Sequence, residues 1–67
     1  MSIMLPDELL AGTPPWMGLA RVASLLGVHR RTLNYWAANG AIPAYKIGGQ
    51  WRVDREELRK WLQDRHN

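Results

Sequence analysis

The stretch that decides the fold runs from Leu19 to Gly40 and reads LARVASLLGVHRRTLNYWAANG. In its first part, apolar residues recur at helical spacing, namely Leu19, Val22, Ala23 and Leu26. Residues three and four apart lie on one side of a helix, so this pattern indicates one buried helix face. We therefore expect a helix from Leu19 to Leu26.

A second helix is expected from Arg30 to Asn39. His29 stands at its N-cap position, and a glycine follows each helix, Gly27 the first and Gly40 the second. Glycine adopts the left-handed conformation that commonly ends a helix. Two short helices separated by a glycine-containing turn form a helix-turn-helix.

A β-hairpin is expected next. Its apolar residues are Tyr45, Ile47, Trp51 and Val53. A three-residue loop over residues 48–50 places all four on one face, and Lys46 and Arg52 together on the other. A two-residue loop would pair Lys46 with Trp51 and mix the faces. We therefore predict the three-residue loop.

The sequence Asp54-Arg55-Glu56-Glu57 fits a capping box. In this motif Asp54 accepts a hydrogen bond from the N–H three residues on, and Glu57 reaches back. The helix that follows would bury Leu58 and Leu62. The elements together predict a mainly α fold with a small β-hairpin, that is, a winged helix-turn-helix with a third helix after the wing.

The first 16 residues are expected to form a partly flexible N-terminal arm, and residues 17–67 the winged helix-turn-helix domain. Pro6, Gly12 and Pro15 interrupt any long element in the arm, although one helical turn can start at Pro6. The apolar side chains of the arm either dock on the domain or meet another copy of the chain.

The tryptophans are interpreted mainly as core residues. Trp36, Trp51 and Trp61 fall on faces that the patterns assign to the core, and a small core needs large apolar groups. Trp16 is not assigned by any pattern. It covers the open end of the core or serves a partner contact.

Composition excludes several classes of protein. The chain has 67 residues and no cysteine, which excludes a disulfide framework, a thiolate zinc site and a cysteine nucleophile. Its two histidines, His29 and His66, have no paired spacing, so no metal is expected. No catalytic constellation or phosphate-binding loop can be assembled, so we expect neither an enzyme nor a cofactor. Without an apolar run of about 20 residues or a basic signal-peptide region, a cytoplasmic protein that binds no membrane is expected.

Charge is distributed unevenly along the chain. The formal net charge is +3, and no carboxylate side chain occurs between Glu8 and Asp54. The basic residues in that interval are Arg21, Arg30, Arg31, Lys46 and Arg52. Such a surface attracts phosphate and is typical of nucleic-acid binders, although charge alone also fits a solvated basic face.

The second helix offers chemistry for DNA recognition. At 100° per residue, Leu33 and Trp36 point to the core, while Arg31, Asn34 and Tyr35 lie on the opposite face. Arg30 lies at the edge of that face. An arginine can donate two hydrogen bonds to guanine, and an asparagine can pair with adenine. The second helix of a helix-turn-helix lies in the major groove, so duplex DNA is the expected partner.

These residues carry a family likeness. The sequence VASLLGVHRRTLNYWAANGAIPAYKIGGQWRVDREELRKWL resembles the winged helix-turn-helix domain of excisionases, which is related to the DNA-binding domain of the mercury-resistance-regulator (MerR) superfamily. The family usually starts its first helix with Ser or Thr and a Glu three residues later. This chain has Gly18 and Arg21 there, so a capping box is lost and a cation is added near where a phosphate could lie. His29 stands where the family often has Ser.

The resemblance implies DNA-contacting positions in the helix and the wing. In the helix they are Arg30, Arg31, Thr32, Asn34 and Tyr35, and in the wing they are Lys46, Gln50 and Arg52.

The resemblance also implies a function: a sequence-specific DNA-binding protein that acts as an excisionase-like recombination directionality factor. Such a factor binds cooperatively with other copies on adjacent sites, bends DNA and directs a phage integrase. A small phage or plasmid transcription regulator with the same DNA-binding surface is the alternative. A third hypothesis is a protein-interaction adaptor that uses the apolar arm and Trp16.

Overall fold

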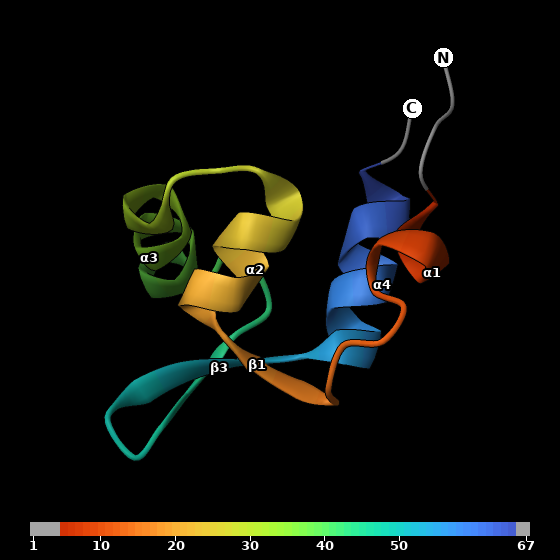
Figure 1. Cartoon of the computed structure of the whole chain (residues 1–67). Helices are drawn as coiled ribbons and strands as arrows, with labels where there is room; N and C mark the ends of the chain where they lie inside the picture. The colour runs from red at the N-terminus through yellow and green to blue at the C-terminus, as the bar shows by residue number, and fades with distance from the viewer. Residues whose placement is uncertain (1–4, 66–67) are drawn as a thin grey trace.

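The computed structural model describes residues 5–65. Within them it has helices and a three-stranded antiparallel sheet in the order β1-β3-β2. The elements are α1 (Pro6–Leu9), β1 (Trp16–Gly18), α2 (Leu19–Leu26), α3 (Arg30–Asn39), β2 (Tyr45–Ile47), β3 (Gln50–Asp54) and α4 (Arg55–Asp64). Helices α2 and α3 lie over one side of the sheet, and α1 packs on α4 beyond the end of β3 (Figure 1). The fold is a small winged helix-turn-helix.

The two helices of the helix-turn-helix have the predicted bounds. Helix α2 ends at Gly27, whose φ of 69° is left-handed and favours glycine. The N–H of Arg31 donates to Nδ1 of His29 at 3.1 Å, so His29 caps α3 as predicted. No side chain caps α2, because its N-cap residue is Gly18.

The core lies between α2, α3, α4 and the inner face of the sheet. Its buried apolar residues are Leu10, Met17, Leu19, Val22, Ala23, Leu33, Ala37, Ile42, Val53 and Leu58. Trp36, Trp51 and Trp61 are partly buried and pack against this core, which confirms their interpretation as core residues.

The register of the hairpin differs from the prediction. The paired residues are Tyr45 with Arg52, Lys46 with Trp51 and Ile47 with Gln50. The loop therefore has two residues, Gly48 and Gly49, with φ of 60° and 81°. Positive φ at both positions is characteristic of a type I′ turn, whose twist matches that of the strands. The predicted three-residue loop was wrong because two adjacent glycines readily adopt positive φ, and the two-residue turn that this allows outweighs the separation of apolar from charged residues.

The new register changes which side chains share a face. Directly paired residues point to the same side of a sheet, and neighbours in one strand point to opposite sides. Lys46 therefore lies on the inner side with Trp51, whereas Arg52 lies on the outer side with Tyr45. The expectation that Lys46 and Arg52 share a face was wrong.

Strand β1 was not predicted. It pairs with β3 so that Trp16 lies opposite Asp54, and the N–H of Arg55 donates to the carbonyl of Pro15 at 2.8 Å. β1 has three residues and follows two prolines, so it is too short for an alternation of apolar and polar residues to be recognised in the sequence. Upstream, Leu10 is buried in the core, so this apolar residue of the predicted arm docks on the domain.

One half of the predicted capping box is formed. Asp54 caps α4 by accepting from the N–H of Glu57 at 3.0 Å. Glu57 does not reach back, so that half of the prediction was wrong. Its Oε2 accepts from the hydroxyl of Tyr45 at 2.8 Å, and its Oε1 is buried with no hydrogen-bond partner among residues 5–65.

None of the helices described is both long and apolar enough to cross a membrane. Residues 5–65 contain no group of three or more His, Asp or Glu side chains placed to hold a metal ion.

Candidate nucleic-acid interface

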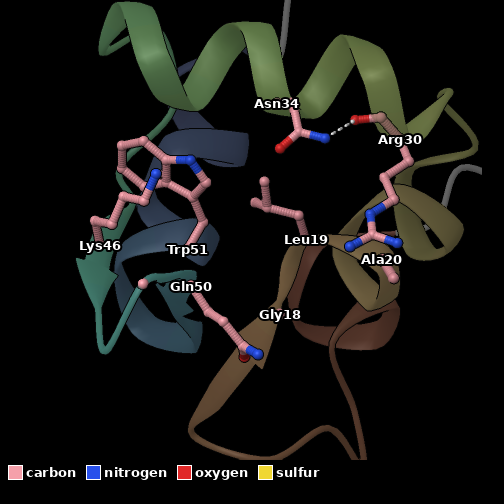
Figure 2. Close-up of a pocket in the computed structure, with 9 residues that line it drawn as sticks. Gly18, Leu19, Ala20, Arg30, Asn34, Lys46, Gln50 and Trp51 are labelled. Atoms are coloured by element: carbon pink, nitrogen blue, oxygen red, sulfur yellow. Dashed lines mark hydrogen bonds between the residues drawn. The ribbon is translucent and has the colours of Figure 1, made fainter.

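A groove of about 360 Å³ lies between α3, the start of α2 and the wing. Helix α3 contributes Arg30 and Asn34, and the wing contributes Lys46, Gln50 and Trp51 (Figure 2). No carboxylate lines the groove. Three segments that are far apart in sequence thus form one polar, basic surface.

The side chains from α3 are placed by the helix itself. Arg30 begins the helix and Asn34 lies one turn later, so both project from the same side toward the groove (Figure 2). The amide of Asn34 donates to the carbonyl of Arg30 at 3.3 Å, which helps to orient its side chain. Both residues are exposed, so a ligand in the groove can reach them.

On the opposite side, Lys46 is held by Trp51. Its Nζ lies 5.4 Å from the centre of the Trp51 ring, which is a cation–π contact. Trp51 is partly buried against the core. The contact therefore places the ammonium group on a rigid support beside the groove.

The start of α2 closes the groove through Gly18, Leu19 and Ala20. Its first backbone N–H groups have no side-chain cap, and no acidic residue stands in the first turn. The N-terminal end of a helix carries partial positive charge. With Arg30 and Lys46 beside it, this end of α2 adds to a surface that favours anions.

Arg52 lies outside this groove. It donates to Oε1 of Gln50 at 3.0 Å. Its guanidinium also lies over Gly18, where an added Cβ would be 3.8 Å from it. Arg52 and Gln50 therefore form a polar pair at the mouth of the groove, on the outer side of the wing.

The remaining predicted residues do not line the groove. Arg31 and Tyr35 are exposed on α3, and the side chain of Tyr35 is 69% exposed. Thr32 is half-buried on the same helix, and Arg21 is exposed on α2. Sequence reasoning missed the start of α2 and Trp51 as groove residues, although an uncapped Gly18 with no acidic residue after it was a usable signal.

Comparison with known families supports this picture. A family model described as Helix-turn-helix domain matches residues 16–66, more than half of the chain. The chain belongs to this helix-turn-helix domain family. The match begins at the first residue of β1 and spans the helix-turn-helix, the wing and α4. Helix-turn-helix domains bind DNA, so the basic groove is a candidate interface for nucleic acid. No curated protein and no solved structure matches the chain significantly.

Proposed function

We propose that this helix-turn-helix protein binds a specific sequence of double-stranded DNA through α3 and the wing. The observation that carries the proposal is the groove without carboxylates, where Arg30, Asn34 and Lys46 converge beside the start of α2. In this arrangement α3 enters the major groove with its N-terminal residues against base edges.

We assign base contacts to the exposed face of α3. Arg31 can read guanine and Asn34 can read adenine, because their side chains match the donors and acceptors of those bases. Tyr35 is exposed enough to contact a phosphate or a thymine methyl group. These side chains would set the sequence preference.

We assign contacts with the DNA backbone to the surrounding polar and basic residues. Arg30 and Lys46 flank the start of α2, where a phosphate would meet two cations and the positive end of a helix. The further assigned contacts are Arg21, Thr32, Gln50 and Arg52. The outer pair of Gln50 and Arg52 would follow the backbone or the minor groove next to the major groove that α3 occupies.

A salt titration tests this assignment. Arg30→Ala should weaken binding to all sequences alike and lower the slope of log K against log salt by about 1. Arg31→Ala should lower affinity for the specific site by about tenfold to a hundredfold and bind unrelated DNA nearly as well as the unaltered chain. Lys60→Ala on α4 is the control, since it removes the same charge from an exposed position outside the groove. Equal losses in all three variants would show that only net charge matters.

We further propose that the protein is an excisionase-like recombination directionality factor in a bacterial cytoplasm. The resemblance in sequence supports this role. A domain this small with a handful of phosphate contacts binds non-specific DNA at about 10⁻⁴–10⁻⁶ M, so neighbouring copies would be needed for useful occupancy. The partners are then other copies on adjacent sites and a phage integrase.

Two assays distinguish this role from the alternative of a small phage or plasmid transcription regulator. Gel titrations should show cooperative binding to DNA with several sites and weaker binding to one site. In gels of circularly permuted DNA fragments, a bend makes the complex migrate more slowly when the bound site lies at the centre of the fragment than when it lies near one end. Independent, unbent binding together with repression of a promoter would favour the regulator.

A further inference from the structure

Of the residues 5–65 that line the groove, Trp51 alone is aromatic, and it is not among the residues to which we assign DNA contacts. It belongs to β3 and is paired with Lys46 of β2 on the inner side of the sheet. Part of its side chain packs against the core, and part lines the groove. Trp51 is therefore both a core residue and a component of the surface that we assign to DNA.

The indole N–H of Trp51 is available to a ligand. A buried indole N–H usually has an acceptor, as in Trp61, whose N–H donates to the carbonyl of Ala41 at 2.8 Å. Trp51 makes no such bond within residues 5–65, and its nitrogen is not buried, since the buried side-chain N or O atom without a partner there is Oε1 of Glu57. The nitrogen lies on the edge of the ring that is turned toward α3 (Figure 2).

The side chains of the groove give this N–H no strong acceptor. No carboxylate lines the groove, and Oε1 of Gln50 already accepts from Arg52 at 3.0 Å. An indole N–H can only donate. Its partner is therefore an acceptor that a ligand brings into the groove.

The surrounding charges favour an anionic acceptor. Nζ of Lys46 lies over the face of the Trp51 ring, 5.4 Å from its centre. The N–H points from the edge of the same ring, so an acceptor bound there lies close to the ammonium group. Arg30 lines the groove from α3. A hydrogen bond to an ionised acceptor is roughly twice as strong as one between neutral groups, so a phosphate oxygen is preferred to the neutral edge of a base.

We infer that the indole N–H of Trp51 donates a hydrogen bond to a backbone phosphate of bound DNA. The inference rests on the proposed function, because it requires duplex DNA in the groove. Packing against the core holds the ring, so little entropy is lost when the phosphate binds. Contacts of this kind fix how a protein sits on the duplex. Because the indole is neutral, Trp51 adds affinity that does not depend on the release of counterions.

The indole N–H signals in nitrogen–proton correlation NMR spectra test the inference on the unaltered chain. Its four tryptophans are assigned by replacing them with phenylalanine one at a time. When a short mixed-sequence duplex is added at low salt, the Trp51 proton should shift downfield and exchange more slowly with water. The signal of Trp16, which lies outside the groove, should not change. A duplex that binds without shifting or protecting the Trp51 signal would overturn the inference.

Removal of the N–H alone should weaken binding. A chain made by chemical synthesis with benzothienylalanine at position 51 keeps the ring and the face that Lys46 covers, but has sulfur in place of the N–H. Its affinity for duplex DNA should be about tenfold lower, with an unchanged slope of log K against log salt because no charge is lost. Lys46→Gln should instead lower that slope by about 1. Equal affinities of the benzothienyl chain and the unaltered chain would show that Trp51 only packs, and would overturn the inference.

Trp51→Phe is the corresponding variant that cells can produce. It should lose at least as much affinity as the benzothienyl chain, since phenylalanine lacks the N–H and offers Lys46 a weaker cation–π contact. Trp16→Phe removes an indole N–H outside the groove and should leave DNA affinity unchanged. Thermal denaturation checks that both variants are folded at the temperature of the binding assay. Equal losses in the two variants would contradict a specific contact by Trp51.

These measurements separate the inference from the proposed function. If Arg30→Ala weakens DNA binding while the Trp51 signal and the benzothienyl chain show no effect, the inference fails and the DNA-binding surface stands. If the unaltered chain shows no salt-dependent affinity for duplex DNA, the proposed function fails and the inference fails with it.

Discussion

At the scale of single residues, two side chains define where helices begin. His29 caps α3 and Asp54 caps α4, and each accepts a hydrogen bond from a backbone N–H of the first turn. Without such a cap these N–H groups have no partner within the helix. The caps therefore fix the residues at which α3 and α4 begin.

Replacement of Asp54 by alanine should lower the free energy of unfolding by about 1 kcal/mol, because the bond to the N–H of Glu57 is lost. Asp54→Asn should retain most of the stability, since its side-chain oxygen can still accept. Urea denaturation followed by tryptophan fluorescence measures both. Asp64→Ala, at the other end of α4, is the control and should change little.

At the scale of elements, the hairpin depends on its two-residue turn. Gly48 and Gly49 both have positive φ, where a residue with a Cβ pays about 1–2 kcal/mol. Gly49→Val should lower the free energy of unfolding by at least that amount, whereas Gly48→Asn should cost little because asparagine suits this position of a type I′ turn. Thermal denaturation compares them. An unchanged midpoint for Gly49→Val would contradict the register described.

Helix α4 also carries an ion pair that links elements. Arg59 donates to Glu56 within α4, and its Nε lies 3.8 Å from a carboxylate oxygen of Asp7 on α1. The hydrogen bond from Arg59 lowers the pKa of Glu56, and the charges of Arg59, Lys60 and Arg55 act in the same direction. The ionised form of Glu56 is thus favoured in the folded chain.

This shift predicts how stability depends on pH. A carboxylate whose pKa is lowered by folding contributes stability at neutral pH, and the contribution is lost as pH falls through the lowered pKa. Urea midpoints measured from pH 7 into the acid range should fall less steeply for Glu56→Gln than for the unaltered chain. Glu8→Gln, whose side chain does not contact Arg59, should keep the original profile. Identical profiles for all three would show that the pair contributes nothing.

At the scale of the whole molecule, the segment before β1 contributes to the core. Leu10 is 3% exposed, and the hydroxyl of Thr13 donates to its carbonyl at 2.6 Å. The guanidinium of Arg55 donates to the carbonyl of Thr13. A domain of this size has few buried side chains, so each one matters to stability.

Leu10→Ala should therefore lower the free energy of unfolding by about 2–5 kcal/mol. Leu5→Ala, which changes an exposed side chain of the same type, should change it by less than about 0.5 kcal/mol. Chemical denaturation of both variants checks the difference. Equal, small effects would mean that the first part of the chain is an arm that does not support the fold.

Much of the architecture was predictable from the sequence because its determinants are local. The bounds of α2 and α3, the caps His29 and Asp54, and the exposed face of α3 follow from residues within one or two helical turns of each other. Helical periodicity, capping chemistry and glycine stops all act over that range, so they can be read along the chain.

Tertiary structure alone decided the sheet and the surfaces built on it. β1 forms only because Trp16–Gly18 meets a strand that lies far ahead in the chain, and the hairpin register was settled by the Gly48-Gly49 turn against the apolar pattern. The groove combines three separate segments, and Trp16, Tyr45 and Ile47 share the outer face of the sheet only in the observed register. Pairing between distant strands depends on contacts that no local pattern encodes, so the sequence by itself could place the two helices of the helix-turn-helix but not the surfaces around them.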